Sequence, residues 1–340
     1  MREQIIANFL AARGWEKADR SLLAQDASFR KFERLRDGER QAVLMDAPPP
    51  KEQVAPFITI AKHLNALGFN APDLFEQDIE NGLLLIEDFG DDTYSQLLAN
   101  PFDNEHFLYA LAIDVLTILH QIPTEQAIPA GLAPYDDDML MEEACLLTDW
   151  YIPAITGGPC IPEAREAYLA AWRPLLERVQ SQPITLVLRD YHVDNLMIID
   201  GQEGIKTCGL LDFQDAVAGP TAYDLISLLE DARRDISDEL YQSMMDRYLE
   251  AIPELVEPGP VGEEFKVACA ILGAQRHTKV IGIFTRLYKR DSKPAYLHHI
   301  PRVWRLLERS IQHPALIDIR QWLDHHIPTQ NRIIPISDGE

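Results

Sequence analysis

The sequence predicts an α+β protein with two parts, a small antiparallel sheet with a few helices over residues 1–90 and a mainly helical part over residues 91–340. Short apolar runs of alternating polarity, separated by turn sequences, are confined mostly to the first part. Long segments with apolar residues at helical spacing fill the second part. The length of 340 residues fits two domains or one large bilobal domain.

In the first part, apolar residues at helical spacing predict helices over 3–13 and 52–67. The dipeptides Asp37-Gly38 and Asn81-Gly82 each separate two apolar runs, as the turns of β-hairpins do. Strands are therefore expected at 29–36, 40–46, 73–77 and 82–87. These elements make up the predicted sheet.

The second part is predicted to be helical at 103–121, 138–152, 161–180, 221–232, 236–251, 262–287, 296–311 and 315–326. One interruption contains three short apolar runs, Thr185–Leu188, Leu196–Ile199 and Lys206–Leu211. The polar loop 189–195 separates the first two runs. A polar loop held between short strands is a common place for functional side chains.

The charge balance limits the classes of partner. With 31 Lys and Arg against 54 Asp and Glu, the formal net charge is −23. Such an acidic chain lacks the basic surface that binds nucleic acid, and an anionic membrane repels it. ATP is not excluded, because Mg²⁺ bridges carboxylates and phosphates, and a cationic small substrate is favoured.

The four cysteines are scattered and form no C-x-x-C pair, which argues against a zinc or redox motif and for free thiols. The first residues lead into an amphipathic segment, and no apolar run approaches the roughly 20 residues that span a bilayer. We therefore expect a cytoplasmic protein without a membrane partner. The oligomeric state is not predicted.

The polar loop carries the most informative residues. Asp190 and Asn195 lie five residues apart within it, and Asp212 follows the third apolar run in Leu210-Leu211-Asp212-Phe213. Phosphoryl transfer needs a carboxylate that orients the attacking hydroxyl and oxygen ligands for Mg²⁺. These residues supply both in the order found in kinases. The structural alternative is that Asp190 and Asn195 are turn residues and Asp212 a helix cap. We favour phosphoryl transfer, because all the pieces follow a small sheet.

At these residues the sequence resembles the aminoglycoside phosphotransferase-like branch of the protein-kinase-like fold, over roughly residues 20–325. The resemblance implies that Asp190 is the catalytic base and that Asn195 and Asp212 hold Mg²⁺. It implies that the adenine of ATP binds to the connector 85–90, through Glu87, Asp88 and Phe89. It also implies that Asp224, in Gly219–Leu225, supports the catalytic loop, although a carboxylate in the first turn of a helix explains that residue equally well.

A narrower resemblance is to the anomeric sugar kinases of peptidoglycan recycling, which phosphorylate N-acetylmuramate and N-acetylglucosamine. It rests on the segments 26–30, 43–49, 190–195, 212–216 and 275–284, of which the last is the most specific. The resemblance implies a small sugar substrate.

The chain departs from the kinase pattern at the phosphate-binding Lys of the third strand. Met45 stands at that position and cannot donate a hydrogen bond, and no Gly lies between Gly14 and Gly38. We expect Ser28, Phe29 and Arg30 to contact the nucleotide instead. The Ser28 hydroxyl can donate to a phosphate, and either Arg30 or Arg34 can replace the missing cation.

Substrate contacts are less well defined by the sequence. The segment 138–151 offers Glu142, Glu143, Asp149 and Trp150, and Arg233 and Arg234 can pair with the lactyl carboxylate of N-acetylmuramate. Solvated helix faces or surface ion pairs explain the same residues. His192 is interpreted as a structural hydrogen-bonding residue, because Asp190 already serves as the base.

The sequence thus predicts a kinase that uses ATP and Mg²⁺ to phosphorylate the anomeric hydroxyl of N-acetylmuramate, N-acetylglucosamine or both. One alternative is a kinase of aminoglycosides or of another small hydroxyl compound. The other is a nucleotide-binding pseudokinase, because the strand Lys is missing.

Overall fold

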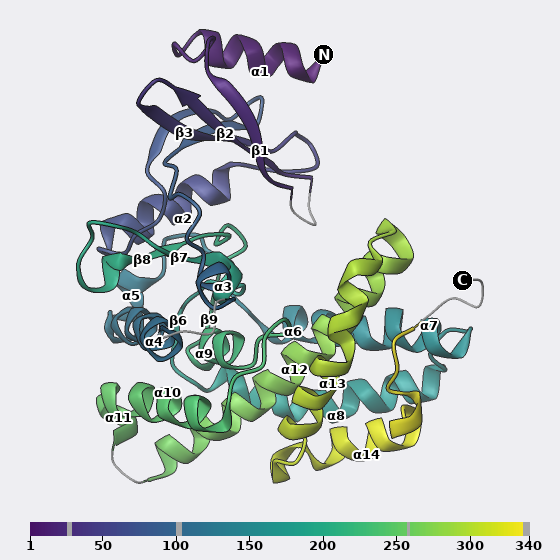
Figure 1. Cartoon of the computed structure of the whole chain (residues 1–340). Coiled ribbons are helices and arrows are strands. Elements are labelled where there is room, and N and C mark those ends of the chain that lie inside the picture. The colour runs from purple at the N-terminus through teal and green to yellow at the C-terminus, as the bar shows by residue number, and fades with distance from the viewer. Residues whose placement is uncertain (26–28, 100–103, 257–258, 336–340) are drawn as a thin grey trace. The chain divides into compact units, whose positions relative to one another are not determined.

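The protein is described by a computed structural model, which covers residues 1–25, 29–99, 104–256 and 259–335 (Figure 1). The chain folds into two compact units. The first unit comprises residues 1–115 and 193–216, and the second comprises residues 116–192 and 217–340. The loop that carries Asp190 and Asn195 therefore joins the two units. The sequence-based boundary after residue 90 stays a prediction.

The first unit is built on a five-stranded antiparallel sheet with the strand order β1-β2-β3-β5-β4. The strands are β1 (Asp19–Gln25), β2 (Lys31–Asp37), β3 (Arg40–Asp46), β4 (Leu74–Asp78) and β5 (Leu83–Ile86). The four predicted strands are confirmed, whereas β1 was not predicted. It is an edge strand, and its Leu22 is 64% exposed, so the strand lacks the alternation of polarity that marks a half-buried strand.

Helices α1 (Arg2–Ala11) and α2 (Ala55–Ala66) accompany this sheet and confirm the two predicted helices. The short α3 (Tyr94–Leu97) follows β5, and α4 (Glu105–Gln121) begins in the first unit and ends in the second. A second hairpin of β7 (Leu196–Ile198) and β8 (Cys208–Leu210) completes the first unit.

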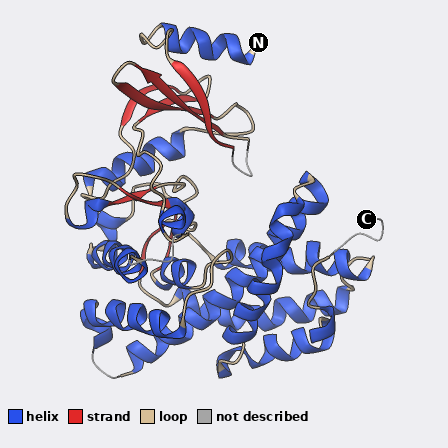
Figure 2. Cartoon of the chain, viewed as in Figure 1, coloured by secondary structure: helices blue, strands red, loops and turns tan. Residues whose placement is uncertain are grey.

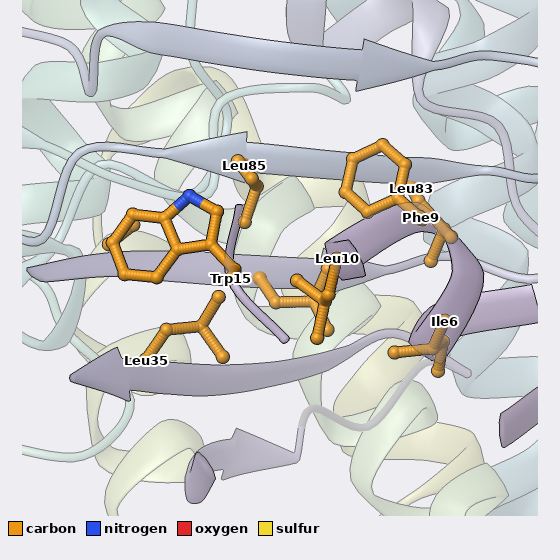
Figure 3. Close-up of a cluster of buried hydrophobic side chains, with 9 residues drawn as sticks. Ile6, Phe9, Leu10, Trp15, Leu35, Leu83 and Leu85 are labelled. Atoms are coloured by element: carbon orange, nitrogen blue, oxygen red, sulfur yellow. The ribbon is translucent and has the colours of Figure 1, made fainter. Parts of the chain in front are cut away.

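The two faces of the sheet serve different purposes because side chains alternate along each strand. Leu35, Ala42, Leu44, Leu83 and Leu85 pack on one face against Ile6, Phe9 and Leu10 of α1 and against Trp15 (Figure 3). Val43 and Ile86, which are sequence neighbours of these residues along β3 and β5, lie on the opposite face, where a cavity is found. Helix α1 therefore covers the face of the sheet that does not line the cavity.

The second unit is largely helical (Figure 2). Its helices are α5 (Thr124–Ala127), α6 (Asp137–Leu146), α7 (Ile152–Thr156), α8 (Pro162–Gln180), α9 (Ala222–Leu229), α10 (Asp238–Ala251), α11 (Pro253–Val256), α12 (Pro260–Asp291), α13 (Ile300–Ser310) and α14 (Ile317–His326). A two-stranded antiparallel pair, β6 (Ile184–Val187) and β9 (Val217–Pro220), completes it. Each predicted helical segment except 138–152 is present as a helix at shifted boundaries, whereas β9 was not predicted.

The prediction of one continuous helix over 138–152 is wrong. Helix α6 ends at Leu146, a π-helical turn occupies Leu147–Tyr151, and α7 follows. A π-helical turn inserts an extra residue, which hydrophobic spacing of 3.6 residues does not reveal. Helix α12 passes very near this region, since a Cβ placed on Gly282 would lie 2.3 Å from the carbonyl carbon of Leu146.

Within the described ranges, no helix has both the length and the apolar character required to cross a membrane.

Candidate functional site

The first unit contains a cavity of about 360 Å³ on the face of the sheet opposite α1. Its apolar walls come from strands β1, β2, β3 and β5 and from the β7–β8 hairpin: Leu23, Phe32, Val43, Ile86, Met197 and Leu211. A slot with apolar walls on both sides suits a flat aromatic base, and its volume is in the range typical of ligand pockets.

The predicted adenine-binding residues Glu87, Asp88 and Phe89 all line this cavity. Burial raises the pKa of Glu87, and its carboxylate accepts a hydrogen bond from the backbone N–H of Asp73 at 3.2 Å. The connector between β5 and α3 therefore forms one edge of the cavity.

Arg34 of β2 holds the connector by several charged hydrogen bonds. Its Nε and Nη2 donate to the two carboxylate oxygens of Asp88 at 2.6 and 2.9 Å. Its Nη1 donates to Asp91 at 2.8 Å, and Nη2 also donates to the carbonyl of Gly90 at 2.8 Å. Bidentate guanidinium–carboxylate pairs are the strong class of protein hydrogen bonds, so the connector is well fixed to the sheet.

Of Ser28, Phe29 and Arg30, all predicted to contact the nucleotide, the structure describes Arg30 and Phe29. Arg30 is 5% exposed, and its Nη2 lies 3.2 Å from Oδ1 of Asp212. Phe29 is 57% exposed and does not line the cavity, and the amine of Lys51 lies 4.0 Å from the centre of its ring. Ser28 lies outside the residues that the structure describes.

Asn195 and Asp212, the predicted metal ligands, come together at the polar end of the cavity. Pairing of Leu196 with Leu210 places the two residues at the same end of the β7–β8 hairpin. The Asn195 amide lies 3.5 Å from Oδ2 of Asp212, and both residues line the cavity. Asp212 has a left-handed backbone (φ +55°), and Gln214 donates to its Oδ1 at 2.8 Å.

This pair has the chemistry that suits Mg²⁺. One amide and one carboxylate supply hard oxygen donors, and Mg²⁺ takes one or two protein oxygens and completes its shell with water and phosphate. In the described part of the chain, no group of three or more His, Cys, Asp or Glu residues is placed to hold a metal by itself. The residues therefore fit a metal that binds together with a phosphate ligand.

In the second unit, the backbone before Asp190 is held by Asp224 in the first turn of α9. The two carboxylate oxygens accept the N–H groups of Leu188 and Arg189 at 2.6 and 2.9 Å. Arg189 has a left-handed backbone (φ +69°), which is costly for a residue with a side chain. Burial raises the pKa of Asp224 to about 7, and the two N–H donors oppose that shift. Asp224 thus fixes the start of the loop.

Asp190 is surrounded by positive charge. Burial alone raises the pKa of a carboxyl group, but Lys279 foremost, then His192, Arg276 and Arg189, together hold the pKa of Asp190 below its ordinary value. Asp190 is therefore ionised at neutral pH. An ionised carboxylate can accept a hydrogen bond from a substrate hydroxyl and orient its oxygen.

Glu143 of α6 binds two of these cations. Its carboxylate pairs with Arg189, and the Nζ of Lys279 lies 2.7 Å from its Oε1. The Tyr135 hydroxyl and the Gln275 amide also donate to Glu143, the latter at 3.2 Å. Glu143 is 8% exposed, and its pKa lies below the ordinary value because Lys279 and Arg189 outweigh the effect of burial. We therefore interpret Glu143 as a partner of the loop and not as a substrate contact.

The other predicted substrate residues of this segment lie at the surface. Glu142 and Asp149 are exposed, Trp150 is half-buried, and Asp149 pairs with Arg165 at 3.2 Å. Because the π-helical turn intervenes, the seven residues from Glu142 to Asp149 no longer equal two α-helical turns.

Arg233, in the segment that follows α9, lies beside the loop that carries Asp190 and His192. Its Nη1 is 3.3 Å from Nε2 of His192, and the Arg233 side chain is 32% exposed. Arg302 of α13 fixes this segment by donating to the carbonyl of Arg233 at 2.7 Å. His192 is 4% exposed, and burial lowers its pKa, so it is neutral at pH 7. Arg234 is half-buried next to Arg233.

Sequence reasoning gave no role to Lys279 and Arg276, whose charges act on Asp190 in the second unit, or to Phe57 in the first unit. Arg276 is 4% exposed and donates from Nη2 to Ser227, whose hydroxyl donates to the carbonyl of Arg189 at 3.3 Å. Phe57 of α2 lines the cavity and stacks on Phe213, with ring centres 4.9 Å apart. The run of polar residues 275–279 inside a predicted helix was the available signal for the first two.

The chain is similar to known phosphotransferases. Residues 19–258 match the model of the phosphotransferase enzyme family. The N-acetylmuramate/N-acetylglucosamine kinase of Caulobacter vibrioides is 34% identical, and the match covers 97% of this chain and 98% of that protein. The enzyme of the same name from Pseudomonas aeruginosa is 35% identical over 94% of this chain and 93% of its own length.

Among solved structures, choline kinase LicA from Streptococcus pneumoniae superposes with a TM-score of 0.62 at 14% identity, covering 92% of this chain and 99% of that one. At such low identity the likeness shows the fold alone. The protein-kinase-like fold predicted from the sequence is confirmed.

Proposed function

Because this chain belongs to the phosphotransferase enzyme family, we propose that it transfers the γ-phosphoryl group of ATP to the anomeric hydroxyl of N-acetylmuramate and N-acetylglucosamine. The observation that carries the proposal is Asp190, a half-buried carboxylate that Lys279, Arg276 and Arg189 keep ionised, five residues before the metal-ligand candidate Asn195. The names of the similar kinases from Caulobacter vibrioides and Pseudomonas aeruginosa support this choice of sugar.

Asp190 has the role of the base in this proposal. Its carboxylate accepts the hydrogen bond of the anomeric hydroxyl and directs an oxygen lone pair toward the γ-phosphorus. As the new O–P bond forms, the bond to the β-phosphate oxygen breaks, ADP leaves, and the hydroxyl proton passes to Asp190. Because phosphoryl transfer is driven by positioning and charge neutralisation, no covalent enzyme intermediate is needed.

The cavity of the first unit is the proposed nucleotide site. The base lies in the apolar slot beside the connector residues Glu87, Asp88 and Phe89, and the phosphates extend toward Asn195 and Asp212, which would hold Mg²⁺. When bound, this ion neutralises negative charge on the transferred phosphoryl group. The fit of the donor set to a hard cation, described above, supports the assignment.

The carboxylate of the substrate offers a second recognition feature. N-acetylmuramate carries a lactyl carboxylate that N-acetylglucosamine lacks, and Arg233 and Arg234 are our candidates to bind it. The proximity of Arg233 to His192, two residues after Asp190, supports this placement. Since the similar kinases are named for both sugars, we expect the carboxylate contact to improve binding without being required. Glu142, Asp149 and Trp150 remain weaker candidates to bind the sugar hydroxyls.

We place the reaction in the cytoplasm, where ATP is available.

ADP release from the purified protein tests the proposal, with ATP, Mg²⁺ and, separately, N-acetylmuramate, N-acetylglucosamine and kanamycin. We expect turnover with the two amino sugars and a ³¹P NMR signal of an anomeric sugar phosphate. Phosphorylated kanamycin without sugar turnover would instead favour an aminoglycoside kinase. Nucleotide binding without turnover on any acceptor would favour a pseudokinase. Asp190→Asn serves as the matched inactive protein in every reaction.

A further inference from the structure

The cavity of the first unit has no cation in its lining. Among the described residues that line it, five are acidic, Glu87, Asp88, Asp91, Asp194 and Asp212, and none is Lys or Arg. A nucleoside triphosphate adds several negative charges to these surroundings. A divalent ion offsets part of that charge, but kinases also use a side-chain cation on the α- and β-phosphates.

The usual strand position for that cation holds Met45. Val43 lines the cavity, and Met45, two residues further along β3, lies on the same face of the sheet. Met45 is completely buried and pairs in register with Phe32 of β2, which also lines the cavity. A thioether cannot donate a hydrogen bond, so this position contributes no charge.

Helix α2 also differs from the corresponding helix of protein kinases. In protein kinases the strand Lys pairs with a Glu of the neighbouring helix. Helix α2, with the sequence Ala-Pro-Phe-Ile-Thr-Ile-Ala-Lys-His-Leu-Asn-Ala, contains no acidic residue. Its Phe57 stacks on Phe213 next to Asp212. An aromatic contact thus connects α2 to the segment that follows Asp212.

Two arginines, Arg34 of β2 and Arg30 just before that strand, are candidates to supply the charge. Arg34 is bound to Asp88, Asp91 and Gly90, so its guanidinium holds the connector. Arg30 precedes Phe32 by two residues, is 5% exposed, and reaches Asp212 with Nη2 at 3.2 Å. A planar guanidinium has five N–H donors and can contact a carboxylate and a phosphate at the same time.

We infer that Arg30 supplies the phosphate-binding cation that Met45 cannot, and that its ion pair with Asp212 holds it at the polar end of the cavity before the nucleotide binds. This inference rests on the proposed function as an ATP-dependent kinase. It identifies which of the two arginines replaces the strand Lys. It also makes Asp212 a shared partner of the cation and of the metal.

The test compares the binding of ADP and of adenosine by isothermal titration calorimetry, with and without Mg²⁺ and without any sugar. Arg30→Met is expected to weaken ADP binding by about tenfold to a hundredfold, the range of one or two charge-assisted hydrogen bonds, and to leave adenosine binding unchanged. Arg30→Lys should retain part of the ADP affinity, since it keeps the charge but not the planar fork. Arg36→Met, which changes an exposed arginine of the same strand, is the charge-matched control.

ADP affinity of Arg30→Met within about twofold of the Arg36→Met control would overturn the inference, as would an equal loss of ADP and adenosine affinity. Adenosine binding guards against misfolding of the neutral variant, because a misfolded cavity would lose adenosine as well as ADP, and partial recovery of ADP affinity in Arg30→Lys then indicates a charge contact with phosphate. The role of Arg30 and the kinase function can also be rejected independently of each other. Sugar turnover with unaltered ADP binding in Arg30→Met rejects the role of Arg30 alone. Selective loss of ADP binding, with no turnover of any sugar by the wild type, rejects the kinase function alone.

Discussion

The buried pair of Glu143 and Lys279 gives the sharpest prediction about stability. Their side chains are 10% and 11% exposed, and the charged atoms are 2.7 Å apart. At this 2.7 Å distance and an effective dielectric constant of about 20, the attraction is about 6 kcal/mol, and desolvation of the two ions offsets much of it. Removing one partner leaves the other buried with less compensation, Glu143 with Arg189 and Lys279 with Asp190. We therefore expect Glu143→Gln and Lys279→Met each to lower the free energy of unfolding by about 3 kcal/mol.

The double variant, which combines Glu143→Gln with Lys279→Met, separates the energy of the ion pair from the effects of each substitution on packing. Because it restores the balance of charge, its loss should be smaller than the sum of the single losses by about 1–3 kcal/mol. Urea unfolding at pH 7, followed by tryptophan fluorescence, measures these values. Four of the five tryptophans lie in the second unit with this pair, at positions 150, 172, 304 and 322, so the signal reports mainly on that unit.

An exposed ion pair of the same unit provides the control. Asp149 and Arg165 are 44% and 40% exposed, with their charged atoms 3.2 Å apart, and Asp149→Asn should change the free energy of unfolding by less than about 1 kcal/mol.

The direction in which pH changes the stability contributed by Glu143 follows from its pKa. Because the pKa of Glu143 is below its ordinary value in the folded state, its contribution is present above the unfolded pKa and is lost as the pH falls through the folded pKa. Single losses below about 1 kcal/mol, or strict additivity in the double variant, would refute the reasoning.

Four further predictions concern the chemistry and its dependence on pH. Asp190→Asn should keep ADP binding but lower the rate of ADP release at least about a hundredfold, and unchanged turnover would disprove its role as the base. Asp212→Ala should abolish the part of ADP affinity that depends on Mg²⁺, which titration with and without the ion measures. Lys279→Met should move the acidic limb of the kcat/KM profile to higher pH, because Lys279 is the foremost cation lowering the pKa of Asp190; an unmoved limb would contradict this. Burial lowers the pKa of His120 to about 3, so the folded state binds fewer protons than the unfolded state below pH 6.5, and stability falls as the pH falls. His120→Gln should reduce that slope by up to about 1.4 kcal/mol per pH unit in urea titrations between pH 6 and 5, and an identical slope would reject the assignment.

Much of the fold was predictable, because burial on one face produces a pattern that survives in the sequence. β3 and β5 are buried strands between clear turns, and the long helices show regular spacing. β1 was missed because an edge strand with an exposed Leu22 has no such pattern. The π-helical turn Leu147–Tyr151 was missed because the extra residue that it inserts leaves no mark in a hydrophobic spacing of 3.6 residues.

The residues of the candidate site also differ in how well the sequence alone reveals them. Asp190, Asn195 and Asp212 could be proposed from the sequence because the chemistry of phosphoryl transfer fixes their types and their spacing along a short stretch of chain. Lys279 was not assigned a role, although its segment was noted, because its partner Glu143 lies 136 residues away in sequence. Glu143 itself was one of several candidate sugar contacts, since a lone Glu on a helix gives no indication of which buried cations it meets.

The clamp of Arg34 on Asp88, Gly90 and Asp91 has a thermodynamic consequence for the ligand. A loop that becomes ordered only when its ligand arrives costs conformational entropy at that moment, and affinity falls accordingly. Here the backbone that borders the base slot is already held to β2 by five charged donor contacts, so little of that entropy remains to be lost. The connector is thus preorganised, and nucleotide affinity reflects the contacts formed more than the ordering of the chain.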